Sequence, residues 1–584
     1  TKDPVMNFMD PLVDAAIAPA QTLENEEVAA DGRVTKLQAT LKHVKMTNFL
    51  GTTMSEFIGC MHLERRPVAP LEEVCERQSR PSQGLNLRQG MDMLSYILSR
   101  AQTFLKRETY TELKEPRIIT TVDGPFKTYY SRVCYSISDQ IKRFDWYGFD
   151  TPDRVAEKVV LAATKCESHI TNSDFSRFDG TLSLVARELE HRVIGAAIIA
   201  GECVMAQEAH ASQVGVQARS THGHKYETGT SRMSGSPETS LFNTIVNAYG
   251  TVPAWRITRK PNGEFYNAEE AWDRLGVYGG DDGISPDVNG ESYKKAAANL
   301  GLKLKLESIQ RGEPGVTFLA RYFSPQVFMG DYNSCCDIAR QLGKFHTTTQ
   351  RLLDDPGKRE DQCLELLRTK AMNFYLTDAQ TPVIGPLCKR VLEVLGEPDK
   401  YERSAELRLT NFWGTYDLSN QFPNRTAGFM VELMDKQLPT FDHVAFQDWL
   451  ERLTPSDVLH PPVVVPREPL KPHATLPVVV DGDLIMPELI EVEEKEEEPE
   501  EEEIPLVGRG ILPTPEPVFQ KQPLSPVTIT KVGPSRPVKK TTPAAKPKPV
   551  PSQRGKRKPK ATFHKTRRTL PKAAGVGPQA RAKW

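Results

Sequence analysis

The chain has 584 residues, of which 39% are hydrophobic and 26% charged, and its formal net charge is −1. This length can enclose a large core with extensions, and no apolar run approaches the ~18 residues that a membrane-spanning helix needs. The nine cysteines show no Cys-x-x-Cys spacing, which favours reduced intracellular thiols over a disulfide-stapled secreted protein.

Charge is segregated along the chain. Residues 1–480 carry −7, residues 481–503 carry −12 and residues 504–584 carry +18. Because the long first part is mildly acidic, any nucleic acid bound there must meet local basic patches rather than a uniformly basic surface.

In chain order, the first candidate site is the run Ser173–Gly180, which reads Ser-Asp-Phe-Ser-Arg-Phe-Asp-Gly. It follows a short apolar stretch and precedes a helical pattern over residues 182–200. We therefore expect Asp174 at the end of a strand and Asp179 near the start of a helix. Asp179 could also be a simple helix cap and Asp174 a turn residue, and the run alone does not decide between these explanations.

The second run is Ser234–Asn243, Ser-Gly-Ser-Pro-Glu-Thr-Ser-Leu-Phe-Asn. Ser236 suits an N-cap, and Pro237 suits the first position of a helix. Helix spacing then places Thr239 and Asn243 on one face. A routine helix start would have the same composition, so the meaning of this run depends on its neighbours.

The third run, Val277–Ser285, reads Val-Tyr-Gly-Gly-Asp-Asp-Gly-Ile-Ser. Apolar residues before the glycines and Ile284 after them predict a β-hairpin with Asp281 and Asp282 at its tip. Two adjacent carboxylates suit hard divalent cations, although Asp-Asp-Gly is also ordinary turn chemistry.

Taken together and in this order, the three runs resemble motifs A, B and C of viral RNA-dependent RNA polymerases, and their details are closest to the nodavirus RNA replicases. The separations suit that family, with 60 residues from Asp174 to Ser234 and 38 from Asn243 to Asp281. The resemblance implies an α+β right-hand polymerase, with fingers, a palm built on an antiparallel sheet and a helical thumb, followed by a disordered C-terminal tail.

A basic segment before the first run resembles motif F, which holds the triphosphate of the incoming nucleotide in that family. Its candidate phosphate-binding residues are Lys106, Lys114 and Arg117. Arginine offers phosphate a planar fork of donors and lysine a point charge. An exposed basic loop is the alternative explanation.

Two segments follow the third run at the places of motifs D and E. Motif D can supply a lysine that protonates the leaving pyrophosphate, and the candidates here are Lys303 and Lys305. Both could instead be strand residues facing solvent. Residues 316–323 take the place of motif E, the primer-grip hairpin.

The resemblance also assigns roles to the acids. Asp174 and Asp281 would hold two Mg²⁺ ions, or Mn²⁺, with Asp282 as a secondary ligand. A site built to bond a hydroxyl rejects the analogue that lacks it, so a group that recognises the ribose 2′-hydroxyl predicts NTPs as substrates and RNA as template and product. That substrate-binding group would comprise Asp179, Ser234, Gly235, Thr239 and Asn243.

The expected organisation has five parts. A segment whose prolines multiply and whose like charges cluster cannot bury enough apolar surface to fold, so we expect the C-terminal part to be disordered. The parts are residues 1–90, wrapping the fingers; 91–170, fingers with motif F; 171–323, palm with a finger insertion at about 201–233; 324–454, helical thumb; and 455–584, a tail with an acidic stretch (481–503) and a basic stretch (531–584).

Two alternative functions are a non-catalytic RNA-binding scaffold of a viral replication complex and an RNA terminal nucleotidyltransferase. The intact acid set argues against the first and the complete motif order against the second. By resemblance, we expect a membrane-bound replication complex and a homo-oligomer, formed through regions missing from this chain. The location would be the host cytoplasm, on the cytosolic face of an organelle membrane such as the mitochondrial outer membrane.

Overall fold

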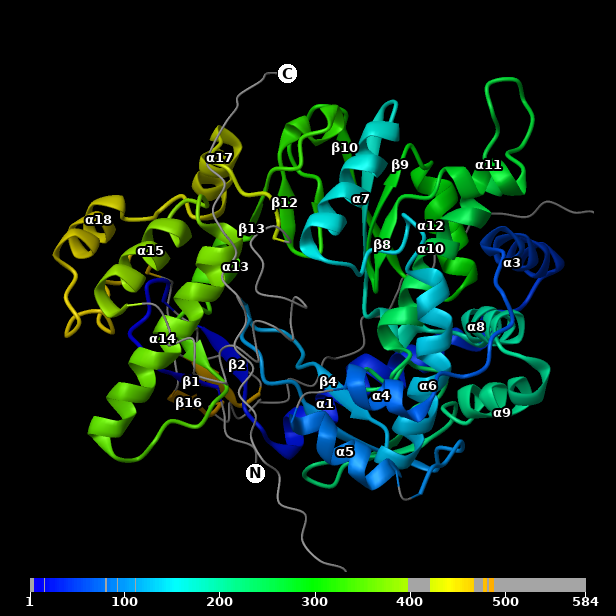
Figure 1. The fold of residues 1–584 in the computed structure, drawn as a ribbon, viewed down its shortest axis with the longest axis horizontal. Helices are drawn as coiled ribbons and strands as arrows, with labels where there is room; N and C mark the ends of the chain where they lie inside the picture. The colour runs from blue at the N-terminus through cyan, green and yellow to red at the C-terminus, as the bar shows by residue number, and fades with distance from the viewer. Residues whose placement is uncertain are drawn as a thin grey trace, which may run out of the picture. The chain divides into compact units, whose positions relative to one another are not determined.

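Figure 1 shows a computed structural model of the chain, and the structure describes residues 5–14, 16–78, 81–91, 93–110, 112–396, 421–466, 476–480 and 483–487. All of them lie in the first of two compact units, Thr1–Glu493, whereas the second unit is Glu494–Trp584. The predicted basic stretch 531–584 and most of the acidic stretch 481–503 therefore lie outside the described residues.

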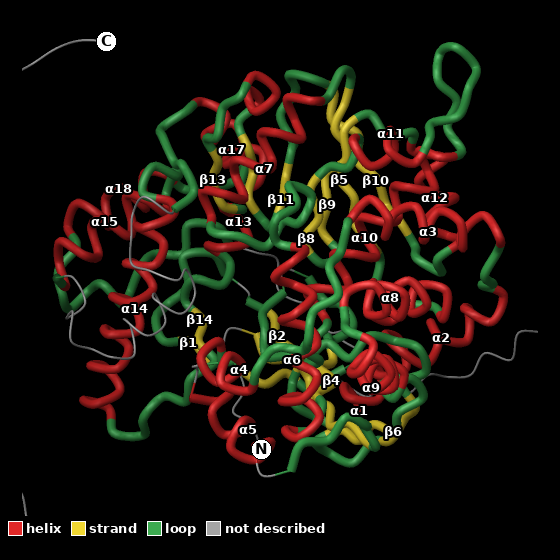
Figure 2. The backbone as a smooth tube through the Cα atoms, turned by 45° about the vertical axis from the view of Figure 1, so that its right-hand side comes forward, coloured by secondary structure: helices red, strands yellow, loops and turns green. Residues whose placement is uncertain are grey.

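The palm is an antiparallel sheet with the strand order β10-β5-β9-β8. These strands lie side by side in Figure 2, with α10 beside them. Their bounds are β5 His169–Phe175, β8 Val277–Gly279, β9 Asp282–Pro286 and β10 Leu304–Gln310.

Apolar side chains alternate along these strands, so both faces of the sheet are covered. On one face, Ile170 and Ile309 share a core with α7 (Pro152–Lys165). On the other face, Phe175 and Tyr278 share a core with the helices α10 and α12. Those helices span Thr239–Arg256 and Gly290–Asn299. Helix α10 is buried nearly all round, as expected for a helix at the centre of a large core.

The fingers combine a four-stranded sheet, in the order β4-β3-β6-β7, with several helices. Strands β3 and β6 run parallel. Asp123 caps α6 by accepting a hydrogen bond from the Phe126 amide at 2.8 Å. The elements are β3 Arg100–Leu105, β4 Ile118–Thr121, β6 Gln217–Ser220, β7 Lys225–Glu227, α3 Asn48–Met61, α4 Leu71–Arg77, α5 Pro81–Met91, α6 Gly124–Ile141, α8 Leu184–Ala197, α9 Ala200–Ala211 and α11 Ala268–Asp273.

A second core joins the thumb helices to the first residues of the chain. Phe8, Leu12 and Val13 are buried there among the thumb side chains, and β1 (Met6–Asn7) pairs with β14 (Thr347–Thr348). A three-stranded sheet of β11 (Thr317–Phe318), β12 (Arg321–Phe323) and β13 (Ser334–Cys336) precedes the thumb. The thumb helices are α13 Ile338–Leu342, α14 Pro356–Asp378, α15 Ile384–Leu395, α17 Gly428–Gln437 and α18 His443–Arg452.

Residues 16–40 contribute β2 (Ile17–Pro19), α1 (Leu23–Ala30) and α2 (Lys36–Thr40). Through them the beginning of the chain reaches both the fingers and the palm. The Gln38 amide donates to the carbonyl of Gly180 at 2.9 Å, and buried Glu26 accepts a bond from the amide of His222 at 3.0 Å.

Two predicted helix boundaries are wrong. The helical pattern over residues 182–200 is interrupted, because Ile198 and Ile199 are extended and pair with the backbone of Arg66. The Ile199 amide donates to the Arg66 carbonyl at 3.0 Å. Helix α10 begins at Thr239 rather than at Pro237, because the hydroxyl of Ser236 donates to Gln213 at 2.7 Å and does not cap the helix.

The prediction of a disordered tail from residue 455 onward is wrong for residues 455–466, 476–480 and 483–487. Val458 and Val464 are buried in the thumb core, and β15 (Val478–Val480) pairs with both β2 and β16 (Asp483–Ile485). Average composition missed these short valine clusters, which pair with residues far away in the sequence. Within the described ranges, none of the helices combines the length and the apolar character that crossing a membrane requires.

Candidate active site

The turn between β8 and β9 presents the two adjacent carboxylates. Gly280 adopts a φ of +68°, which a residue with a side chain rarely tolerates, and Asp281 is exposed at the tip. Helix α10 supports the turn from behind. The Asn247 amide donates to the carbonyls of Gly280 and Asp282, both at 3.0 Å, and the Gly280 amide donates to the Thr244 hydroxyl at 2.8 Å.

Asp282 differs from its neighbour in its surroundings. It is partly buried at the start of β9, and its carboxylate accepts a 2.6 Å hydrogen bond from the Leu319 amide. Burial, together with the negative charges of Asp281 and Asp174, raises the pKa of Asp282 to about 7. Asp282 is thus engaged by the protein, whereas Asp281 stays exposed.

The Leu319 amide belongs to the tip of the hairpin β11–β12. Leu319 and Ala320 have φ values of +47° and +59°, a conformation that hairpin tips usually reserve for Asn and Gly. Two non-glycine residues are therefore held in a strained turn beside the carboxylates. The sequence predicted a hairpin over residues 316–323, but it gave no sign of this contact with Asp282.

Asp174 lies next to this turn on the central strand β5. It is exposed, and its neighbour Ser173 stands opposite Gly283 of β9. On the other side, Lys305 stands directly opposite Asp174, so their side chains share one face of the sheet. The Lys303 carbonyl accepts a bond from the Ser176 amide at 2.9 Å, at the end of the same ladder.

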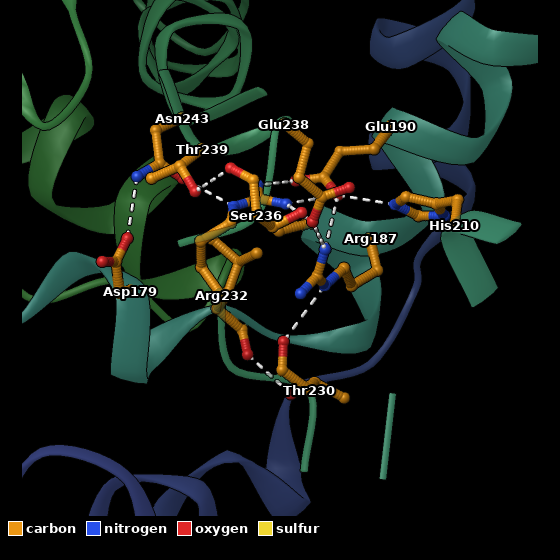
Figure 3. Close-up of polar contacts among 12 residues, drawn as sticks. Asp179, Arg187, Glu190, His210, Thr230, Arg232, Ser236, Glu238, Thr239 and Asn243 are labelled. Atoms are coloured by element: carbon orange, nitrogen blue, oxygen red, sulfur yellow. Dashed lines mark hydrogen bonds and ion pairs between the residues drawn. The ribbon is translucent and has the colours of Figure 1, made fainter. Parts of the chain in front are cut away.

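Asp179 and Asn243 form the second part of the site, and Asp179 lines one cavity together with Asp281. The Asn243 amide donates to Asp179 Oδ1 at 2.8 Å, as Figure 3 shows. Burial raises the pKa of Asp179, while Asn243 and Arg232 act in the opposite direction. The predicted partners of this pair have other contacts. The hydroxyl of Thr239 bonds the Met233 carbonyl at 3.0 Å, and that of Ser234 accepts from the Thr120 amide at 3.2 Å.

Gly235 lies where its loop passes close to strand β4. Its amide donates to the Thr120 carbonyl at 2.8 Å, and a Cβ built on it would lie 2.8 Å from that carbonyl oxygen. A side chain here would push the loop away from β4, so the backbone of this loop needs glycine for its packing.

A cavity joins the acids to a basic wall. Of the predicted residues, its lining contains Lys114, Arg117, Asp179, Ser234 and Asp281. The lining also includes basic residues without an assigned role in the sequence analysis, namely Arg33, Arg177, Arg232 and Arg340. Lys106 does not line this cavity; it pairs with Glu108 at 2.9 Å.

Three of these four arginines come from widely separated parts of the chain. Arg177 lies within the first acidic run, has a left-handed φ of +55° and pairs with Glu115 at 2.5 Å. Arg33 precedes α2 and donates to the carbonyl of Pro116 at 2.8 Å. Arg340 belongs to the thumb helix α13. Only Arg177 stood in a recognisable motif, so sequence spacing could have pointed to that residue alone.

A buried cluster of charged side chains (Figure 3) adjoins the cavity, which its member Arg232 lines. In the described part of the chain, its members Glu190, His210 and Glu238 are the one set of three acids and histidines whose ligand atoms lie within 4.8 Å of one another. Arg187 and Arg232 pair with both glutamates. Two buried cations already balance two buried carboxylates, so this cluster is an ion-pair network and not a vacant metal site.

No protein-family model matches the chain. Among curated proteins it is 30% identical over 400 residues to the RNA-directed RNA polymerase of Greasy grouper nervous necrosis virus, a match that covers 65% of this chain and 38% of that protein. It is 27% identical over 401 residues to the RNA-directed RNA polymerase of Flock house virus, with the same coverage. The chain thus spans well under half the length of these relatives.

Among solved structures, the RNA-dependent RNA polymerase of a human picobirnavirus is similar, with a TM-score of 0.49 and 12% identity over 70% of this chain and 83% of that one. The sequence relatives and the order of the three acidic and polar runs agree. Over 65% of its length, the chain is similar in sequence to the RNA-directed RNA polymerases of Greasy grouper nervous necrosis virus and Flock house virus.

Proposed function

We propose that this chain synthesises RNA from NTPs on an RNA template. The observation that carries the proposal is that Asp281 and Asp179 line one basic cavity. Asp179 is bonded there to Asn243, and the exposed Asp174 acts with Asp281 on the carboxyl group of Asp282. The names of the relatives support the same reaction.

The carboxylates fit a divalent cation. Carboxylate oxygens are the hard donors that Mg²⁺ prefers. Burial is the main cause of the raised pKa of Asp282, and the negative charges of Asp281 and Asp174, which a cation would offset, add to it. Asp174 and Asp281 would hold Mg²⁺ or Mn²⁺, with Asp282 assisting. The chemistry that two such cations supply when bound is activation of the primer 3′-hydroxyl and stabilisation of the departing pyrophosphate.

The remaining roles belong to side chains of the chain itself. Lys114 and Arg117 line the cavity and would hold the triphosphate, joined by Arg177. Asp179 Oδ1 is bonded to Asn243, so its second oxygen can accept the ribose 2′-hydroxyl. Of the two candidate lysines, Lys305 shares a face with Asp174. We therefore assign the proton donor for pyrophosphate to Lys305 rather than Lys303.

The decisive experiment is the incorporation of labelled NTPs on templates of defined sequence with Mg²⁺. Asp281→Asn should lower incorporation at least about a hundredfold, since even residues that merely support metal ligands cost 10–100-fold when changed. Asp361→Asn is the matched control, because Asp361 is an exposed carboxylate on α14. Wild-type activity in Asp281→Asn would refute the proposed centre.

The same assay separates the alternatives. RNA binding without incorporation by the wild-type chain would identify a scaffold, and product whose sequence ignores the template would identify a terminal nucleotidyltransferase. Assembly of a membrane-bound complex, oligomer formation and location on the cytosolic face of an organelle membrane are further proposals that rest on family resemblance. Flotation of the expressed chain with vesicles would test the membrane association.

A further inference from the structure

Arg232 connects the buried ion-pair network to Asn243. It lies in the loop before Ser234, and its side chain is fully buried. Its two terminal nitrogens pair with Glu190 and Glu238. Its third nitrogen, Nε, donates instead to Asn243 Oδ1 at 2.9 Å. Figure 3 draws Arg232 between the two glutamates and Asn243.

This contact decides which way the Asn243 amide faces. An asparagine amide has an accepting oxygen and a donating NH₂ at nearly the same positions, so it can be turned over with little steric change. Arginine can only donate and keeps its proton. As long as Arg232 faces Asn243, the oxygen must point toward Arg232 and the NH₂ toward Asp179.

The network also keeps Arg232 from moving. Glu190 is further bonded to His210 at 2.7 Å, and Glu238 accepts bonds from Tyr130 at 2.7 Å and Gln213 at 2.9 Å. The Arg232 amide donates to the Asp179 carbonyl at 2.8 Å. The same residue thus holds the backbone of Asp179 and the side chain of its partner.

We propose that Arg232 is a positioning residue for ribose selection: anchored by Glu190 and Glu238, it fixes the Asn243 amide so that Asp179 is ready to accept the 2′-hydroxyl. The inference rests on the proposed function. Without Arg232, the amide of Asn243 can turn its oxygen toward Asp179, where two acceptors would face each other and the hydroxyl-binding geometry would be lost.

Arg187 provides a matched control within the same network. It pairs with Glu190 at 3.1 Å and Glu238 at 2.5 Å and is equally buried, but its other bonds go to the carbonyls of Thr230 and Ser231. Arg187→Lys and Arg232→Lys therefore each disturb ion pairs with the same two glutamates. Only Arg232→Lys removes a guanidinium group that also bonds Asn243.

The experiment measures kcat/KM for an NTP and for its 2′-deoxy analogue on one template, with thermal unfolding of each variant. Arg232→Lys should lower the ratio of the two kcat/KM values at least about tenfold, whereas Arg187→Lys should leave it within about twofold at a similar loss of thermal stability. Arg232→Lys combined with Asn243→Ala should select no worse than Asn243→Ala alone, because the effect acts through that amide.

An unchanged ratio in Arg232→Lys, or an equal fall in Arg187→Lys, would overturn the inference. If Arg232→Lys does not fold, Glu190→Gln tests the same point by loosening the anchor: a fall in the ratio beyond that of Arg187→Lys supports the inference, and an unchanged ratio overturns it. A wild-type chain that incorporates no NTP refutes the proposed function instead, so the two failures are distinguishable.

Discussion

Replacing Gly180 with alanine should disturb the wall of the basic cavity, which Gly180 and Arg33 both line. Gly180 follows Asp179, and the backbone that precedes α2 crosses directly over it. A Cβ built on Gly180 would lie 1.9 Å from the carbonyl oxygen of Arg33 and 2.7 Å from Leu37 Cδ1. The Arg33 carbonyl is backbone, so it cannot escape by changing a rotamer, and the segment that carries it must move.

The size of the effect follows from that geometry. The Arg33 carbonyl would have to retreat about 1.5 Å, from 1.9 Å to an ordinary contact of about 3.4 Å. Overpacking of this kind costs typically about 1–3 kcal/mol, and we expect the upper end. The side chain of Arg33 donates to the carbonyls of Pro116 and Glu115 at 2.8 and 3.0 Å, so the motif F segment should shift with it.

The assay is thermal unfolding together with NTP incorporation. Gly180→Ala should lower Tm by several degrees and raise KM for NTPs more than it lowers kcat. Gly59→Ala is the control, because Gly59 is exposed within α3 and a Cβ there meets no atom within 4 Å; it should stabilise the protein by about 0.5–1 kcal/mol. A Gly180→Ala protein with unchanged Tm and KM would refute this reasoning.

Three further changes have defined outcomes. Asp287 accepts bonds from the amides of Glu167, Ser168 and His169 at 2.7–3.1 Å. Burial opposes ionisation, but these bonds prevail and hold the pKa of Asp287 below its ordinary value. Its stabilisation is therefore present above the unfolded pKa of about 4 and lost as pH falls through the lower folded pKa. Asp287→Asn should cost about 1–3 kcal/mol at pH 7 and weaken the acid limb of a denaturation series. Arg321→Met should lower the free energy of unfolding in urea by about 3–5 kcal/mol, because it leaves the buried Asp378 carboxylate, which Arg321 contacts at 2.7 Å, without its cation. An added Asp378→Asn should recover part of that free energy. A single variant as stable as the wild type would contradict the reasoning. A chain ending at residue 475 should have a lower Tm and a lower nucleotide affinity than one ending at 487, because β15 pairs with β2 and the preceding Pro477 carbonyl accepts a bond from the Asn25 side chain at 2.8 Å. Equal behaviour of the two chains would show that β15 has no such role.

The sequence predicted the parts of the site that depend on local patterns. Alternation around the glycines predicted the β8–β9 turn, and the apolar stretch before Asp174 predicted the end of β5; the structure has both. The family resemblance placed Asp179 and Asn243 in one substrate-binding group, and the structure adds that the two side chains are bonded to each other.

Features that depend on distant contacts escaped prediction. The break between α8 and α9 arises from pairing with Arg66, 132 residues away from Ile198, and no local residue signals it. Arg33 joins the cavity because the beginning of the chain crosses the palm, and the buried partners of Arg232 come from three separate helices or loops. Composition predicted disorder at residues 478–480, but these three valines pair with the strand at residues 17–19.

The pairing of β15 with β2 has a consequence for the order of folding. The Asn25 side chain bonds the Pro477 carbonyl across 452 residues of sequence, and Ile17 of β2 also pairs with Tyr110 beside the motif F segment. Contacts of such separation close late, because a long loop must be ordered before they form. During synthesis on the ribosome, β2 can therefore gain its β15 neighbour only after residue 480 has emerged, long after the last palm strand, which ends at Gln310, has been made.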